Sequence, residues 1–570
     1  MRRRRAVAGP AALRRGAWRV VAALAASGCL PGCADGGAAP AAAPGPLHFR
    51  DVTAASGIHL VTTSGRTPST QILEVKGGGL ALIDWDDDGD FDLFVPNGAT
   101  LDRPEEGPGC RLYENEGGLR FADTTAASGV DFRRWGFGPA VGDADGDGRD
   151  DLFVSCFGRD ALLHNEGGGR FRDVTEAAGA SDSQWSTAAC FVDLEGDGDL
   201  DLYVANYLEF DPAHPPAPTR FLGVEVFAGP AGLPAAPDSV WRNDGTGVFA
   251  DVSEALGFRA VQPRHGLGVV ALDFDADGRQ EILVGNDSGP NFLFRRGDDG
   301  AFTDVATPNG LATNADGREQ ATMGLAIADV DGNGLPDVFS TNFQNDTNTL
   351  HLNLGDLLFE DRTLEWGLGA LSRPFVGWAT GFADFDLDQD EDLVVLNGHV
   401  YPREVTEPHG WGHEQAPLLL ERSGSRFARV APGAGGEWLA APRCNRSAVL
   451  ADLDRDGDLD LITGELNGKV RVLENDGARG NWLVVALEDA RPGVANRRGY
   501  GARVELVGGG GRQRRWIHAG GSYQAAQPPE ACFGLADDVT RVELEVTWPD
   551  GQRQSVTGAA TRQRLVVERR

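Results

Sequence analysis

The residues most able to do chemistry in this sequence lie in an acidic nine-residue loop that occurs seven times. Each copy reads Asp-x-Asp-x-Asp-Gly-x-x-Asp or a close variant. The copies begin at Asp84, Asp143, Asp193, Asp273, Asp329, Asp384 and Asp452. Carboxylates at positions 1, 3, 5 and 9, with a glycine at position 6 to turn the backbone, bring hard oxygen ligands to one point, which is how proteins hold calcium. We therefore expect calcium as the cofactor.

The expected metal ligands are positions 1, 3, 5 and 9 of each loop, together with the backbone carbonyl at position 7. In chain order they are Asp84, Asp86, Asp88, Asp90, Asp92, Asp143, Asp145, Asp147, Arg149, Asp151, Asp193, Glu195, Asp197, Asp199, Asp201, Asp273, Asp275, Asp277, Arg279, Glu281, Asp329, Asp331, Asn333, Leu335, Asp337, Asp384, Asp386, Asp388, Asp390, Asp392, Asp452, Asp454, Asp456, Asp458 and Asp460.

An EF-hand is the nearest rival for such a loop, but it needs a glutamate at position 12 and a helix on each side. Position 12 is Val95, Val154, Val204, Val284, Ser340, Val395 or Thr463. These residues lie in short runs rich in β-branched and aromatic residues, which predict strands. A solvated turn would explain one acidic loop. Seven copies in register favour a repeated metal site between strands.

Two further elements recur with the loops and indicate the fold. A Phe-x-Asp segment such as Phe49–Asp51 opens each unit, and a segment such as Val472–Asn475 closes it. Four short strands per unit, seven units and almost no helical period predict an all-β, seven-bladed β-propeller over residues 47–478. Alternating runs separated by Gly or Pro turns over 479–570 predict a small C-terminal β-sandwich-like domain.

The charge of the chain agrees with this interpretation. The formal net charge is −33, and the seven loops hold 34 of the 85 acidic residues. An acidic surface without a basic stripe argues against nucleic acid as a partner.

The N-terminus has the features of an export signal. Basic residues in 1–15 precede a short apolar stretch and small residues, so residues 1–33 are expected to be a removed leader, followed by a flexible linker over 34–46. Cys29 and Cys33 each stand where a bacterial lipoprotein would be cleaved and acylated. We expect a cell-surface or outer-membrane lipoprotein that meets the membrane through its lipid anchor only. Ordinary secretion is the alternative.

Five cysteines lie after the leader, and their spacing matches no metal motif. A disulfide between Cys156 and Cys190 would join neighbouring blades. Buried free thiols are the alternative.

A catalytic site is weighed at His399, His409 and His413, in the insertion between the sixth and seventh loops. The last two have the i, i+4 spacing of a metal pair on a helix, but Pro408 and the neighbouring glycines oppose a helix. Neither a Gly-x-Ser-x-Gly motif nor a P-loop occurs in the sequence. We therefore predict a protein that is not an enzyme.

Several segments resemble known families. The loops resemble FG-GAP or VCBS repeats, the blade type of integrin α-chain heads. The segments 285–296, 315–334 and 396–402 resemble bacterial relatives of cartilage acidic protein, and GYGARVELV (499–507) with VTWPDGQRQSV (546–556) resembles an ASPIC/UnbV domain. Departures from the loop pattern are Glu195, Glu281, Asn333 and Gln389.

The sequence and the resemblance together predict an exported calcium-binding propeller. It would act as a monomeric cell-surface binding, adhesion or scaffold module for an extracellular protein or glycan. The alternative is a hydrolase or lyase that acts on extracellular polysaccharide with the propeller as its catalytic body.

Overall fold

The computed structural model describes residues 47–130, 132–509 and 511–570. The leader and linker predicted for residues 1–46, with Cys29 and Cys33, lie outside the described residues. The described residues form one compact unit. In the described part of the chain, no helix is both long enough and apolar enough to span a membrane.

Each acidic loop joins the first two strands of a four-stranded antiparallel sheet. In the first sheet the order from inside to outside is β2 (Leu80–Ile83), β3 (Asp92–Val95), β4 (Arg111–Asn115) and β5 (Phe121–Asp123). The second to fourth sheets are β6 (Gly136–Gly142), β7 (Asp151–Cys156), β8 (Ala161–Asn165), β9 (Phe171–Asp173); β10 (Ser186–Val192), β11 (Asp201–Asn206), β14 (Ser239–Asn243), β15 (Phe249–Asp251); and β16 (Gly266–Leu272), β17 (Glu281–Asn286), β18 (Phe292–Arg296), β19 (Phe302–Asp304). The fifth and sixth are β20 (Leu325–Ala328), β21 (Asp337–Ser340), β22 (Thr349–Asn353), β23 (Phe359–Asp361); and β24 (Gly377–Ala383), β25 (Asp392–Asn397), β26 (Leu418–Ser423), β27 (Arg426–Arg429).

The last sheet closes the ring with a strand from the other end of the chain. It contains β28 (Asn445–Ala451), β29 (Asp460–Glu465) and β30 (Val470–Asn475), and its outer strand is β1 (Phe49–Asp51), in which Phe49 pairs with Asn475. Each inner strand contacts the inner strand of the next sheet, and β28 contacts β2. The predicted all-β propeller is confirmed.

The Phe-x-Asp strands do not lie where the sequence placed them. They were expected to open each unit and so to share a sheet with the loop that follows them. Instead β5, which precedes the second loop, pairs with β4 and is the outer strand of the first sheet, and the other Phe-x-Asp strands are placed in the same way. The sequence repeat is therefore offset from the sheet by one strand, and this offset lets β1 complete the last sheet. The phenylalanine is buried, and the aspartate accepts a hydrogen bond from a backbone N–H two residues on, as Asp123 does from Thr125 N at 3.0 Å. That bond starts the short helices α1 (Thr53–Ser56), α2 (Thr125–Ser128) and α3 (Thr175–Ala178).

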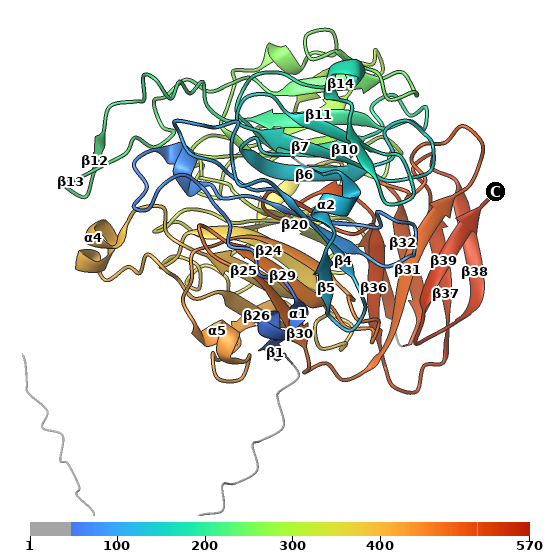
Figure 1. The fold of residues 1–570 in the computed structure, drawn as a ribbon. Coiled ribbons are helices and arrows are strands. Elements are labelled where there is room, and N and C mark those ends of the chain that lie inside the picture. The colour runs from blue at the N-terminus through green and yellow to red at the C-terminus, as the bar shows by residue number, and fades with distance from the viewer. Residues whose placement is uncertain (1–46, 131, 510) are drawn as a thin grey trace, which may run out of the picture. The chain divides into compact units, whose positions relative to one another are not determined.

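Two insertions leave the ring from the strand ends opposite the acidic loops. One follows β11 and contains the hairpin β12 (Thr219–Phe221) and β13 (Val224–Val226), and the other follows β25 and contains α4 (Arg403–Thr406) and η3 (Glu407–His409). Figure 1 shows β12, β13 and α4 on the side away from the C-terminal strands. The remaining short elements are η1 (Ile72–Val75), η2 (Phe258–Ala260) and α5 (Glu437–Ala440).

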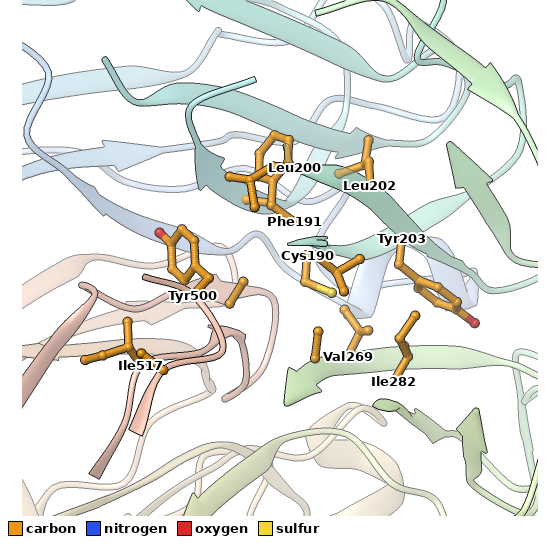
Figure 2. Close-up of a cluster of buried hydrophobic side chains, with 14 of the residues drawn as sticks. Cys190, Phe191, Leu200, Leu202, Tyr203, Val269, Ile282, Tyr500 and Ile517 are labelled. Atoms are coloured by element: carbon orange, nitrogen blue, oxygen red, sulfur yellow. The ribbon is translucent and has the colours of Figure 1, made fainter. Parts of the chain in front are cut away.

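The C-terminal residues form two sheets, in line with the predicted β-sandwich-like domain. One has the order β36 (Glu530–Leu535), β31 (Asn481–Asp489), β39 (Arg564–Arg569), and the other has the order β33 (Gly511–Trp516), β32 (Arg503–Gly508), β37 (Arg541–Thr547), β38 (Arg553–Ala560). Their apolar core is continuous with that of the ring. Figure 2 shows Tyr500 of this domain next to Phe191 of β10 and Leu200 of the third acidic loop, and Ile517 belongs to the same buried cluster.

One segment of the C-terminal domain enters the centre of the ring. This segment, residues 519–527, is called the axial tongue below. Its strand β34 (Ala519–Gly520) pairs with β16, and β35 (Ala525–Ala526) pairs with β2. Further contacts reach β6, β10, β20, β24 and β28, so the tongue touches the inner strand of every sheet of the ring. A Cβ at Gly79 would lie 1.8 Å from the carbonyl oxygen of Gln524, so this approach requires glycine.

The described cysteines include no Cys156–Cys190 disulfide. Both residues are buried free thiols, so the disulfide alternative is wrong and the thiol alternative is confirmed.

Candidate metal centres

The position-1 carboxylate organises each acidic loop. In the second loop, Asp143 Oδ1 accepts hydrogen bonds from the N–H groups of Gly146 (2.8 Å) and Asp147 (3.1 Å), and Oδ2 accepts from Gly148 N (2.8 Å). Gly146 and Gly148, at positions 4 and 6, have φ values of +74° and +95°. Glycine adopts these left-handed conformations without steric cost. The loop thus wraps around the first carboxylate and turns the next ones inward.

The position-9 carboxylate braces the loop against its sheet. In the third loop, Asp201 Oδ2 accepts from Leu194 N at 2.9 Å, and Oδ1 accepts from Asn243 N at 2.8 Å. The other position-9 residues have equivalent backbone donors at one or both oxygens. Each carboxylate oxygen has a second lone pair, so this bracing leaves position 9 able to bind a cation.

In five sheets, an asparagine at the end of the third strand binds the neighbouring acidic loop, a role that was not predicted from the sequence. The Nδ2 of Asn243 donates to the carbonyl of Ala144 at 2.7 Å, which is position 2 of the preceding loop. Asn115, Asn165, Asn353 and Asn475 bind position 2 of their preceding loops in the same way. These bonds join neighbouring loops around the ring. The recurrence of Asn at this strand end was the available signal.

The predicted ligands converge in space. Carboxylate oxygens of positions 1, 3 and 5 lie within 4.8 Å of one another in the first two loops, and those of positions 1, 3 and 9 do so in the fourth and fifth. The side chains at position 7 do not join these groups in the second and fourth loops. Arg149 pairs with Asp147, and Arg279 Nη2 lies 2.8 Å from Asp277 Oδ2. At position 7 the backbone carbonyl therefore remains the expected ligand.

Several carboxylate oxygens of the described loops are buried without a hydrogen-bond donor, which also fits a bound cation. Within the described residues, buried oxygens of Asp86, Glu281, Asp329, Asp386 and Asp452 have no hydrogen-bond donor. Buried acceptors without donors are rare in folded proteins and call for an explanation such as a bound ion. A divalent cation with oxygen ligands would satisfy them.

The raised pKa values of the loop carboxyls also fit a bound cation. Burial raises the pKa of Asp143 and of Asp452, both at position 1, to about 7, although hydrogen bonds from the loop backbone oppose the shift. Burial raises the pKa of Asp92 and of Asp392, both at position 9, to about 9. These shifts describe carboxylates that lack a compensating positive charge.

The departures from the loop pattern keep the loop conformation. Gln389 has a φ of +86°, close to the +89° of Gly89 at the same position. The side-chain oxygen of Asn333 accepts from Leu335 N at 2.8 Å, just as Asp147 accepts from Arg149 N at 3.0 Å. Glu281 braces its loop by accepting from Phe274 N at 3.0 Å.

Arginines of the C-terminal domain contact the acidic loops directly. Arg498 Nη2 lies 3.0 Å from Asp150 Oδ2 and 3.9 Å from Asp84 Oδ2, and Arg514 Nη1 lies 3.1 Å from Asp329 Oδ2. The domain therefore covers part of the loop face and balances part of its charge.

Two histidines of the sixth-sheet insertion, His399 and His413, are held by hydrogen bonds of their own. His399 Nε2 lies 2.9 Å from Gln344 Oε1, and its Nδ1 accepts from Tyr401 N at 3.0 Å. Burial lowers the pKa of His399 to about 3. The helical turn η3 ends at His409, where Gly410 has a φ of +76°. In this part of the described chain no helix carries His409 and His413 together, as the Pro and Gly residues predicted.

Comparison with known families agrees with these observations. The family model of the ASPIC and UnbV domain matches residues 493–570, and that of the FG-GAP-like repeat matches residues 143–204, 273–340 and 329–395. The chain therefore carries FG-GAP repeats followed by an ASPIC/UnbV domain, as the resemblance implied.

Among curated proteins, the chain is similar to cartilage acidic protein 1. The Homo sapiens protein is 30% identical over 320 residues, which cover 53% of this chain and 44% of that protein. The Xenopus tropicalis protein is 29% identical over 315 residues, which cover 54% and 44%. The chain thus spans less than half the length of these relatives.

Two solved structures share a more distant likeness. A structure of an Agrocybe aegerita lectin that recognises non-reducing terminal N-acetylglucosamine has a TM-score of 0.38 at 16% identity, covering 66% of this chain and 90% of that one. A structure of YCF48 bound to D1 peptide has a TM-score of 0.40 at 9% identity, covering 76% and 98%.

Proposed function

We propose that this chain is an exported, calcium-binding β-propeller that acts as a binding, adhesion or scaffold module at the cell surface. Its partner would be an extracellular protein or glycan. The observation that carries the proposal is the repeated loop in which converging, buried carboxylate oxygens lack hydrogen-bond donors.

Calcium is the cation that best matches the ligand set. The loops offer carboxylate and carbonyl oxygens, which favour hard cations over the zinc and copper held by His and Cys. Magnesium demands near-ideal octahedral geometry and keeps several of its waters, so a site built from many protein oxygens favours calcium. Extracellular modules bind calcium with dissociation constants of about 10⁻⁴–10⁻³ M, so even weak loops would fill at millimolar calcium.

The arrangement of the ring favours binding over catalysis. The axial tongue contacts every inner strand, so a segment of the chain itself lies at the ring axis. The C-terminal domain covers part of the loop face. The insertions on the opposite side expose apolar residues at the tip of the β12–β13 hairpin, where Leu222 is 53% exposed. Loops held on a rigid scaffold are common binding elements.

Placement outside the cell rests on two supports. The FG-GAP repeats and the cartilage acidic protein relatives suggest an extracellular protein. The sequence of the leader adds the proposed lipid anchor at Cys29 or Cys33, and the spacer that follows would give the propeller reach from the membrane.

A retention experiment separates binding from catalysis. The mature protein is passed over immobilised glycans and extracellular proteins in millimolar calcium and again in chelator. A binder retains one partner in calcium, and the variant Leu222→Asp reduces that retention, while Leu364→Asp, an exposed leucine in the loop after β23, does not. Release of shortened polysaccharide without retention would instead support the hydrolase or lyase alternative.

A further inference from the structure

Each acidic loop has a neighbouring side chain at an equivalent place in its sheet. The charge of this side chain differs from loop to loop. In every sheet of the ring, loop residue 10 pairs with a third-strand residue, and the next residue on that strand is called the facing position below. In chain order the facing positions are Glu114, His164, Arg242, Arg295, Leu352, Glu421 and Glu474.

The facing position acts on loop position 3, one of the expected calcium ligands. In the second loop, His164 Nδ1 lies between two expected ligands, 3.4 Å from Asp145 Oδ2 at position 3 and 3.1 Å from Asp151 Oδ1 at position 9. In the third, Arg242 Nε lies 3.7 Å from Glu195 Oε1. In the fourth, Arg295 Nη2 lies 2.8 Å from Asp275 Oδ2. In these three loops, and in the sixth and seventh, where Glu421 and Glu474 act electrostatically on Asp386 and Asp454, the facing side chain therefore interacts with the residue at loop position 3.

The fourth loop already holds positive charge between its ligands. Arg295 Nη2 also lies 3.2 Å from Asp277 Oδ2, so one nitrogen bridges positions 3 and 5. Arg279, at position 7, pairs with the same Asp277 carboxylate at 2.8 Å. Two of the carboxylates expected to hold calcium are therefore already ion-paired.

The sixth loop presents the opposite arrangement. Glu421 is exposed at its facing position, and its negative charge adds to that of Asp388 beside the buried Asp386. Asp386 retains a buried oxygen without a donor among the described residues. Here the facing residue increases the negative charge around the ligands.

We propose that the facing position sets the calcium affinity of each loop, and that Arg295 makes the fourth loop a low-affinity site by supplying its counter-charge. The proposal deepens the function proposed above and rests on it. Calcium affinity rises with the negative charge of the ligand set. A guanidinium in contact with two ligands must be repelled or displaced when the cation binds. The sixth loop, with its exposed facing Glu421, fills before the third and fourth loops, whose facing residues are arginines.

The test exchanges charge at the facing position and measures bound calcium by equilibrium dialysis at graded free calcium. Arg295→Leu introduces the residue found at the facing position of the fifth loop, and Arg318→Leu, at an exposed arginine in the turn between β19 and β20, is the matched control. We expect Arg295→Leu to lower the calcium dissociation constant of one site by at least about tenfold. At a free calcium concentration too low to fill this site in the parent, the variant should bind about one more ion per chain. Arg318→Leu leaves the isotherm unchanged.

The reverse exchange and a site-resolved measurement complete the test. Glu421→Arg weakens one site and removes about one bound ion at intermediate calcium. Anomalous diffraction from crystals grown at limiting calcium shows density in the fourth loop of Arg295→Leu and none in that loop of the parent. If the parent binds calcium but the isotherms of Arg295→Leu and Arg318→Leu coincide, the inference is overturned. If the parent binds no calcium at millimolar concentration, the proposed function falls and this inference falls with it.

Discussion

Replacing Tyr523 tests the role of the axial tongue in holding the ring together. Tyr523 is fully buried at the ring axis, and its ring packs edge-on against Trp378 with centroids 4.8 Å apart. Its hydroxyl donates to the carbonyl of Lys76 at 3.2 Å, which ties the tongue to the segment before β2. The variant Tyr523→Ala removes all of these contacts and leaves a cavity where the inner strands meet.

The expected loss follows from these contacts. Truncation of a buried aromatic residue to Ala costs about 3–5 kcal/mol of unfolding free energy, and the edge-on ring pair places this site within that range at about 4 kcal/mol. Tyr523→Phe keeps the ring and loses one hydrogen bond, which costs about 1 kcal/mol. Leu364→Ala, at a side chain that is 81% exposed, serves as the surface control and costs less than about 0.5 kcal/mol.

The assay is unfolding in calcium, by denaturant and by heat, with hydrogen exchange of the inner strands as a local measure. Tyr523→Ala should lower the melting temperature by several degrees and raise exchange in β2 and β16. If Tyr523→Ala unfolds within about 1 kcal/mol of Leu364→Ala and leaves exchange in these strands unchanged, the tongue does not stabilise the ring and the reasoning is refuted.

Four other predictions follow from the loops and the leader. Gln389→Gly should stabilise the protein by about 1 kcal/mol in denaturant unfolding, because glycine relieves the left-handed φ of +86°; a destabilised variant would contradict this. Asp452→Ala should lower the melting temperature in calcium more than Asp329→Ala, because the seventh loop has the fuller carboxylate set and closes the ring; the opposite ranking would contradict it. In chelator, the free energy of unfolding should fall as pH rises from about 4 to about 9, because the position-1 and position-9 carboxyls have folded-state pKa values raised to between about 6 and about 9. The stabilising contribution of these carboxyls is lost as they ionise. Calcium should make this dependence on pH weaker, and an unfolding free energy that does not change with pH in chelator would count against the prediction. Replacing both Cys29 and Cys33 by Ala should move the exported protein from the membrane fraction to the soluble fraction, and equal partitioning of variant and parent would refute lipidation.

The repeat made most of the fold predictable. The acidic loops and their flanking apolar runs have a strong local signal, so the strands on both sides of each loop were predicted from sequence. The Phe-x-Asp strands were found but assigned to the wrong sheet. Strand pairing between the two ends of the chain, such as Phe49 with Asn475, depends on ring closure and leaves no local pattern.

The site was predictable in its ligands and not in its surroundings. Loop positions 1, 3, 5 and 9 follow from spacing alone, whereas the contact of Arg295 with Asp275 depends on strand register. The buried ion pair of Lys76 Nζ with Asp287 Oδ2, at 3.1 Å, joins residues 211 positions apart and has no sequence signature. Nothing in the composition of the axial tongue predicts its insertion at a ring axis.

The central claim, that the repeated loops bind calcium and that calcium stabilises the ring, is tested most directly by one paired measurement. Purified mature protein is stripped with chelator and divided, and thermal unfolding and bound metal are measured in chelator, in millimolar calcium and in millimolar magnesium. The account predicts several calcium ions per chain, a melting temperature several degrees higher in calcium than in chelator, and poor substitution by magnesium. Identical melting curves in calcium and chelator, with no calcium bound, would contradict it.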